Sequence, residues 1–236
     1  MKTLCSVFII LAIAVSILFI SCGKKEEKDE MTVEDAEKIL EAKKALDEMS
    51  DMIIPEIEAH HNSAVSTLRI SIQGMMKTMA KKDYDQNGKK DYPASICLMH
   101  YGVNSAGECC QLIGKYLAHA DFLSDGTFSI TYKDAWDEGK EKTKNFKWEK
   151  EPKQNYWYAM IPKMADGTPY KDKYESHYAI CAFPAKYGEK GKLTFIMNEK
   201  GVIYQKDLGE GKLIDQWPAD DPATKGWEKV EKDQED

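Results

Sequence analysis

Leu193-Thr-Phe-Ile-Met-Asn-Glu-Lys-Gly-Val-Ile-Tyr-Gln205 is the stretch of sequence that decides the fold. Its two apolar runs, Leu193–Met197 and Val202–Gln205, contain the β-branched and aromatic residues that favour strands. The four residues between them end in Gly201, placed where a tight connection needs left-handed backbone. The stretch therefore predicts an antiparallel β-hairpin.

Three more strands are predicted upstream of this hairpin. Residues Thr127–Tyr132 alternate strictly between apolar and polar side chains, which is typical of a half-buried strand. Tyr156–Ile161 and Tyr178–Phe183 have strand composition as well. Asp134–Pro152 is charged and without period, and we expect a long irregular loop there. Sequential strands joined by short turns indicate an antiparallel meander.

Helices are predicted before and between these strands. Apolar residues recur at alternating spacings of three and four in two series, Ile39–Ile53 and Val65–Met79. Pro55 is expected to end or bend the first helix. A third helix is expected to begin at Ser105 and to run to Ala120.

Together these elements predict the α+β class, with a long N-terminal helix packed on an antiparallel β-meander. Five parts are expected along the chain: a signal peptide at 1–21, a charged tether at 22–31, a helical stalk at 32–62, the α+β domain at 63–230 and an acidic tail at 231–236.

A family resemblance supports the same architecture. Tyr178–Gly209, above all Ala182–Gly188 and Leu193–Gly209, resembles a stretch of an uncharacterised family of exported bacterial proteins. Members of that family look like pseudopilins of the type II secretion system in overall design, and the resemblance extends from about Val65 to Trp227. Since the family's activity is unassigned, the resemblance implies only a pseudopilin-like fold.

The N-terminus departs from the pseudopilin pattern. The chain has no cleavage site of the Gly-Phe-Thr-Leu-Ile-Glu type, and charged residues 24–30 separate its apolar N-terminus from its helices. Assembly into a pilus-like fibre is therefore not expected, although a pseudopilin-like secretion component stays an alternative function.

The first thirty residues predict the location of the protein. Lys2, the uncharged run Leu4–Ile20 and the small residues after it form an export signal. Leu18-Phe-Ile-Ser-Cys22 resembles a bacterial lipobox, which implies lipidation at Cys22, although Phe19 stands where leucine is usual. An uncleaved anchor helix is the alternative. We expect a lipid anchor in the cell envelope, with the outer membrane favoured because aspartate does not follow Cys22.

The overall charge excludes one class of partner. The chain has a net charge of −7, and Arg69 is its single arginine. A surface that follows nucleic-acid phosphates needs a basic patch and usually several arginines. We therefore expect no nucleic acid among the partners.

The segment Asp83–Asp91 is a candidate calcium loop. It matches the first six positions of the pattern in which Asp83, Asp85 and Asn87 supply oxygen ligands, and Asp91 stands at position nine. Position twelve is Ala94, so a complete EF-hand is excluded. The alternative is a plain helix C-terminus and turn around Asn87-Gly88.

The four cysteines after Cys22 are expected to form two disulfides in an exported protein. If Ser105 begins a helix, consecutive Cys109 and Cys110 point about 100° apart, which disfavours a bond between them. We therefore expect Cys97 to pair with one of them and Cys181 with the other. Four buried thiols are the alternative, and zinc is disfavoured because no C-x-x-C spacing exists.

Sequence motifs for catalysis are absent. The chain has no G-x-S-x-G and no glycine-rich phosphate loop. Its five histidines share no helical face: His60, His61, His100, His119 and His177. The aromatic residues of the second half are expected to serve mainly in the core, with a binding face as the alternative: Trp148, Tyr156, Trp157, Tyr158, Tyr170, Tyr174 and Tyr178.

We therefore expect a non-enzymatic, membrane-anchored envelope lipoprotein with a binding or scaffolding role. Its expected partners are the membrane, through the lipid anchor, and an envelope protein or glycan. A secreted hydrolase with a site in Asp134–Pro169 is the alternative.

Overall fold

The computed structural model describes residues 33–81, 88–103, 108–133, 137 and 140–231 of the chain. The chain divides into two units, Met1–Ile54 and Pro55–Asp236. The second unit, called the head below, contains both β-sheets. None of the helices in the described part of the chain is long and apolar enough to cross a membrane. The apolar run Leu4–Ile20 lies outside that part.

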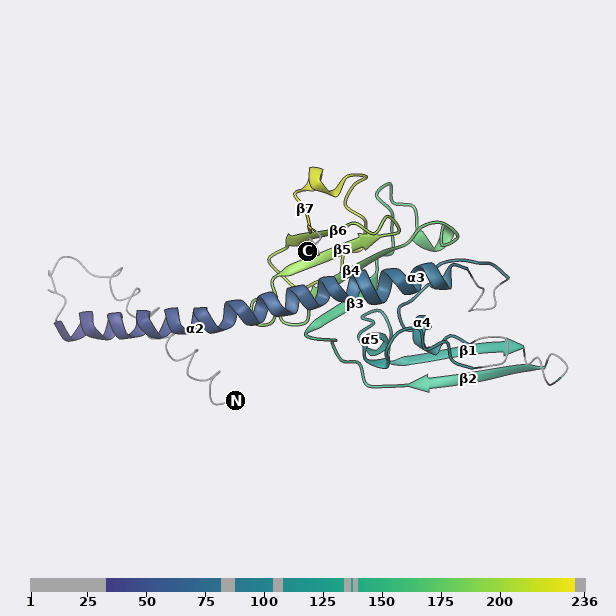
Figure 1. The fold of residues 1–236 in the computed structure, drawn as a ribbon, viewed down its shortest axis with the longest axis horizontal. Coiled ribbons are helices and arrows are strands. Elements are labelled where there is room, and N and C mark those ends of the chain that lie inside the picture. The colour runs from purple at the N-terminus through teal and green to yellow at the C-terminus, as the bar shows by residue number, and fades with distance from the viewer. Residues whose placement is uncertain (1–32, 82–87, 104–107, 134–136, 138–139, 232–236) are drawn as a thin grey trace, which may run out of the picture. The chain divides into compact units, whose positions relative to one another are not determined.

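One uninterrupted helical stretch begins the described chain (Figure 1). Helix α2 (Val33–Ser66) continues directly into the π-helix η1 (Thr67–Ile72) and helix α3 (Gln73–Met79). Pro55, expected to end or bend a first helix, does not end it, because α2 runs through Pro55. Proline removes one amide donor from the helix. The helix continues because the residues on both sides keep a helical pattern, and the residues after Pro55 pack in the head.

The main sheet of the head has five antiparallel strands in the order β3-β4-β5-β6-β7. They are β3 (Tyr156–Met160), β4 (Ala179–Pro184), β5 (Leu193–Asn198), β6 (Ile203–Asp207) and β7 (Glu228–Lys229). The β5–β6 hairpin turns at Gly201, whose φ is +74°. The predicted α+β class and antiparallel meander are thus confirmed (Figure 1).

Side chains alternate between the two faces of this sheet, as the pleat of a strand requires. On one face Tyr158, Ile180 and Phe195 pack with the buried side of the helical stretch, formed by Ala64, Leu68, Ile72, Met76 and Met79. On the other face Ala159, Cys181 and Ile196 pack against Trp217 and Trp227 of the C-terminal segment. The sheet is therefore buried on both faces, with different partners on each.

A second, two-stranded sheet pairs β1 (Thr127–Lys133) with β2 (Glu141–Lys147). The expectation of an irregular loop over Asp134–Pro152 is therefore wrong for the residues of β2. The sequence of β2 has Phe146 as its one apolar side chain, which lies opposite Phe128 of β1. Pairing with β1, rather than a period of its own, makes this segment a strand.

The predicted helix from Ser105 to Ala120 is also wrong for most of the residues described there. Among residues 108–120 only α5 (Lys115–His119) is helical, and a single turn, α4 (Leu98–Tyr101), precedes it. Cys110 and Leu112 instead donate their amides to the carbonyls of Gly102 and Met99. Short 3-10 helices at Tyr170–Asp172 and Pro222–Lys225 complete the head.

Candidate binding groove

A groove of about 540 Å³ lies in the head between the helical stretch and the main sheet. This volume is in the usual range for ligand sites. The groove is lined by residues of the helix and of the sheet with its C-terminal continuation: Glu58, His61, Asn62, Val65, Ser66, Arg69, Ile70, Leu193, Phe195, Gln205, Val230 and Glu231.

The helical wall follows directly from the spacing of its residues. Positions 58, 61, 62, 65, 66, 69 and 70 recur at three and four, so they share one side of the helix. Arg69 and Ile70 lie in the π-helix, where the amide of Gln73 bonds to the carbonyl of Leu68, five residues back. Such π-turns occur mostly as local irregularities and often at functional sites.

The π-helix has one side buried in the core and another side exposed to water. Leu68 and Ile72 are fully buried in the core, whereas Ile70 is 71% exposed at the groove. An exposed isoleucine is unremarkable alone, but here it borders a hollow that other apolar side chains also line. The groove therefore has apolar surface that the head leaves in contact with water.

The opposite wall comes from strands β5 and β6 and from the end of the chain. Leu193, Phe195 and Gln205 lie on the sheet face that the helix covers, and Phe195 pairs in register with Gln205. Val230, whose amide bonds to the carbonyl of Ile203, completes this wall. Three segments far apart in sequence thus form the groove: the helix, the β5–β6 hairpin and the C-terminal residues Val230 and Glu231.

Arg69 is the cationic side chain among the described residues that line this groove. Its Nη2 donates one long hydrogen bond, 3.4 Å, to the backbone carbonyl of Glu231. Among the ion pairs of the described residues, none includes Arg69. A half-buried guanidinium in this state can donate a bidentate pair to a carboxylate or a similar anion.

His61 fastens the groove's two walls to each other. Its Nε2 accepts hydrogen bonds from the amides of Lys192 at 3.1 Å and Leu193 at 3.5 Å, and its ring meets that of Phe195 edge-on. Burial lowers the pKa of His61, so the imidazole is neutral at pH 7. An accepting Nε2 leaves the proton on Nδ1. His61 is therefore mainly a structural group.

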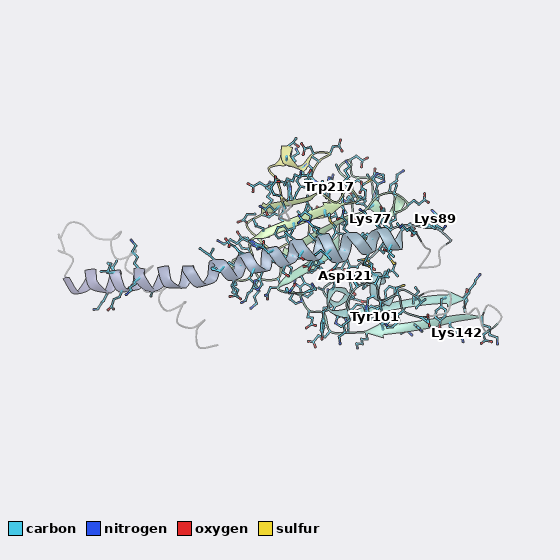
Figure 2. All side chains as sticks on the ribbon, viewed as in Figure 1. Lys77, Lys89, Tyr101, Asp121, Lys142 and Trp217 are labelled. Atoms are coloured by element: carbon cyan, nitrogen blue, oxygen red, sulfur yellow. The ribbon has the colours of Figure 1, made fainter. Side chains whose placement is uncertain are left out.

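The second hollow of the head, about 310 Å³, surrounds Asp121. Asp121 is 1% exposed, and Figure 2 shows it on the side of the head that carries the β1–β2 hairpin. Its Oδ2 accepts hydrogen bonds from the amides of Ile96 (3.0 Å) and Cys97 (3.1 Å), and its Oδ1 accepts one from Leu123 (3.2 Å). Burial raises the pKa of Asp121, and these amides act in the opposite direction.

The groups that line this second hollow have a structural role. Desolvation raises the pKa of the Cys97 thiol to about 12, so the thiol is protonated at neutral pH and is a poor nucleophile. Oδ2 of Asp121 accepts from the backbone turn that starts α4, and Oδ1 accepts from the amide of Leu123, two residues further along the chain. We therefore place the candidate functional site at the groove.

The predicted calcium loop is only partly covered by the structure. Asp83, Asp85 and Asn87 lie outside the described residues, as does the lipidation residue Cys22. Asp91 is described, close to the exposed ion pair of Lys89 with Glu175 at 3.0 Å. Within the described ranges no cluster of three or more His, Cys, Asp or Glu residues could hold a metal ion. Calcium binding stays a prediction.

The predicted disulfides are not formed: Cys97, Cys109, Cys110 and Cys181 are free thiols. Cys181 points to the sheet face covered by the C-terminal segment, whereas Cys97 belongs to the core on the other face. The premise that Cys109 and Cys110 lie on a helix is wrong as well, because described residues 108–114 are not helical.

The aromatic residues serve mainly in the core, as expected. Tyr156, Tyr158, Tyr170 and Tyr178 are buried. Trp148, Trp157 and Tyr174 are half-buried at the edges of the two clusters. The sequence singled out none of the groove residues as a site, although the uniqueness of Arg69 was a signal that could have done so.

Comparison with known proteins finds one family that part of the head is similar to. Residues 134–230 match the family described as "Protein of unknown function (DUF2950)". The matched region includes strands β2 to β7 and the sheet wall of the groove up to Val230, but not its helical wall. No curated protein and no solved structure matches the chain.

Proposed function

We propose that the protein is a non-enzymatic lipoprotein of a bacterial cell envelope that is anchored through Cys22 and binds another envelope component in the groove of its head. The predicted export signal and the charged tether predicted at residues 22–31 support the anchor. A pseudopilin-like role in secretion is the alternative that the family resemblance suggests.

The observation that carries the binding role is the state of Arg69 and Ile70. One is a half-buried guanidinium without an ion pair among the described residues, and the other is an isoleucine 71% exposed beside it. A ligand that covers both groups is stabilised in two ways: Arg69 can donate a charge-assisted hydrogen bond to it, and the apolar surface of Ile70 becomes buried. A hydrolase that uses Cys97 or Asp121 has less support, because both groups are buried and held by bonds within the chain.

The anchor and the groove are tested by two experiments on membranes of the native host. In the first, fatty-acid labelling and membrane fractionation compare wild type with Cys22→Ser. Loss of label and release from the membrane are expected for the variant, and equal label in both proteins would refute the anchor.

In the second, membranes are solubilised in mild detergent and separated by native electrophoresis. Wild type is expected in a complex larger than its own mass, and Ile70→Asp is expected to run alone. Leu123→Asp is the matched control, since Leu123 is 52% exposed and lines the other hollow. If both variants stay in the complex, or both leave it, the groove is not the binding site.

A further inference from the structure

We propose that the groove takes an extended peptide about five residues long, with an acidic side chain at its Arg69 end and a basic side chain at its Glu58 end. This inference rests on the proposed binding role of the groove and names the chemistry of the ligand. It is argued from the length, the polarity and the charges of the lining.

The length of the groove fits a short extended segment. Glu58 and Arg69 are eleven residues apart on the continuous helical stretch. At 1.5 Å per residue this separation is about 16 Å along the helix axis. An extended chain rises about 3.3 Å per residue, so about five residues span it.

The polarity of the lining fits a peptide backbone. Three polar side chains along the groove, those of Asn62, Ser66 and Gln205, make no hydrogen bond to any described residue. Amide and hydroxyl groups of this kind pair well with backbone N–H and C=O groups. Between them, Val65, Leu193 and Val230 give apolar contacts. An acyl chain would bury the polar groups without partners, and a glycan would lack an exposed ring, since Phe195 is 1% exposed.

The charges set the orientation. Arg69 is cationic at one end, and at the other end Glu58 makes no ion pair within the described part of the chain. Glu231 contacts Arg69 through its backbone carbonyl. A ligand with opposite charges at its two ends is therefore complementary, and one with two like charges is repelled at one end.

The test uses the purified full chain in detergent and fluorescence anisotropy with three labelled, end-blocked peptides: Lys-Val-Ser-Val-Glu, Lys-Val-Ser-Val-Lys and Glu-Val-Ser-Val-Glu. Wild type is expected to bind the first about tenfold more tightly than the other two. Arg69→Glu is expected to prefer the peptide with two lysines. Lys77→Glu, which reverses an exposed charge on α3 of the same helical stretch (Figure 2), is expected to keep the wild-type preference.

Absence of binding by all three peptides, equal binding of all three, or an Arg69→Glu preference that matches wild type would overturn the inference. Displacement of the bound peptide by oleate at stoichiometric amounts would also overturn it, in favour of a lipid. If these peptides do not bind but Ile70→Asp still dissociates the native membrane complex, the proposed function stands and only the inferred peptide ligand is wrong.

Discussion

The two hollows of the head differ in what their polar groups bind. At Asp121 the carboxylate accepts three backbone amides, and the neighbouring Cys97 thiol contacts the hydroxyl of Ser95 at 3.3 Å. At the groove, Arg69 has one long bond to a carbonyl, and Ile70 faces water. A hollow whose polar groups are satisfied within the chain stabilises the fold.

In the groove, by contrast, polar groups are not fully satisfied within the described part of the chain, and this difference distinguishes a structural hollow from a binding site. Buried polar groups need partners, so partners found inside the chain indicate a structural role. Polar and apolar groups that stay in contact with water, and whose burial under a ligand would be favourable, indicate a site for another molecule. Volume alone does not separate the two cases.

The largest expected contrast is in thiol reactivity. Burial raises the pKa of Cys97 to about 12, so at pH 8 its thiolate fraction is below that of an exposed cysteine of ordinary pKa by about a thousandfold. Alkylation by iodoacetamide, followed at each site by mass spectrometry, should be slower by at least that factor at Cys97 than at Ser66→Cys in the exposed groove wall. In urea the two rates should become similar. Rapid native alkylation of Cys97 would mean that the hollow is open.

Loss of the Asp121 carboxylate should cause the next largest effect. Asp121→Ala leaves the buried amides of Ile96 and Cys97 without an acceptor, and the free energy of unfolding should fall by about 3–5 kcal/mol. Urea denaturation measures it. Asp125→Ala is the control in the same hollow, because that carboxylate is exposed and, among the described residues, accepts its side-chain hydrogen bonds from the nearby Thr127. Equal losses in the two variants would contradict the structural role of Asp121.

A smaller contrast is expected between two neighbours on the π-helix. Leu68 is fully buried and Ile70 is 71% exposed. Leu68→Ala should lower the free energy of unfolding by about 2–5 kcal/mol, and Ile70→Ala should change it by less than about 0.5 kcal/mol. Thermal and urea unfolding of both variants check this. A loss at Ile70→Ala comparable with that at Leu68→Ala would show that Ile70 belongs to the core.

The sequence predicted the elements whose signals are local. The strictly alternating residues Thr127–Tyr132 form β1, and the run Leu193–Gln205 forms the hairpin of β5 and β6. Strand β2 could not be predicted in this way, because its seven residues include one apolar side chain and its shape depends on β1. Pro55 does not end the helix, because the penalty of one proline is outweighed by the helical pattern on both sides of it.

The groove could not be predicted from sequence, because its walls are distant along the chain. His61 accepts its hydrogen bond from Lys192, 131 residues away, and no local period connects the two. The exposure of Ile70 likewise depends on the π-helix, which shifts the register of the helical side chains and has no sequence signature. Arg69 was visible in the sequence only as the single arginine.

The most direct test of the central claim compares cross-linking from the two hollows in cells of the native host. A photoreactive amino acid replaces Asn62 in the groove or Ser124 in the hollow of Asp121, in the full-length, membrane-bound protein. We predict a cross-linked product from position 62 that weakens strongly in the Arg69→Gln background, and none from position 124. A product from position 124 alone, or one from position 62 that Arg69→Gln leaves unchanged, would contradict the assignment of the groove as the binding site.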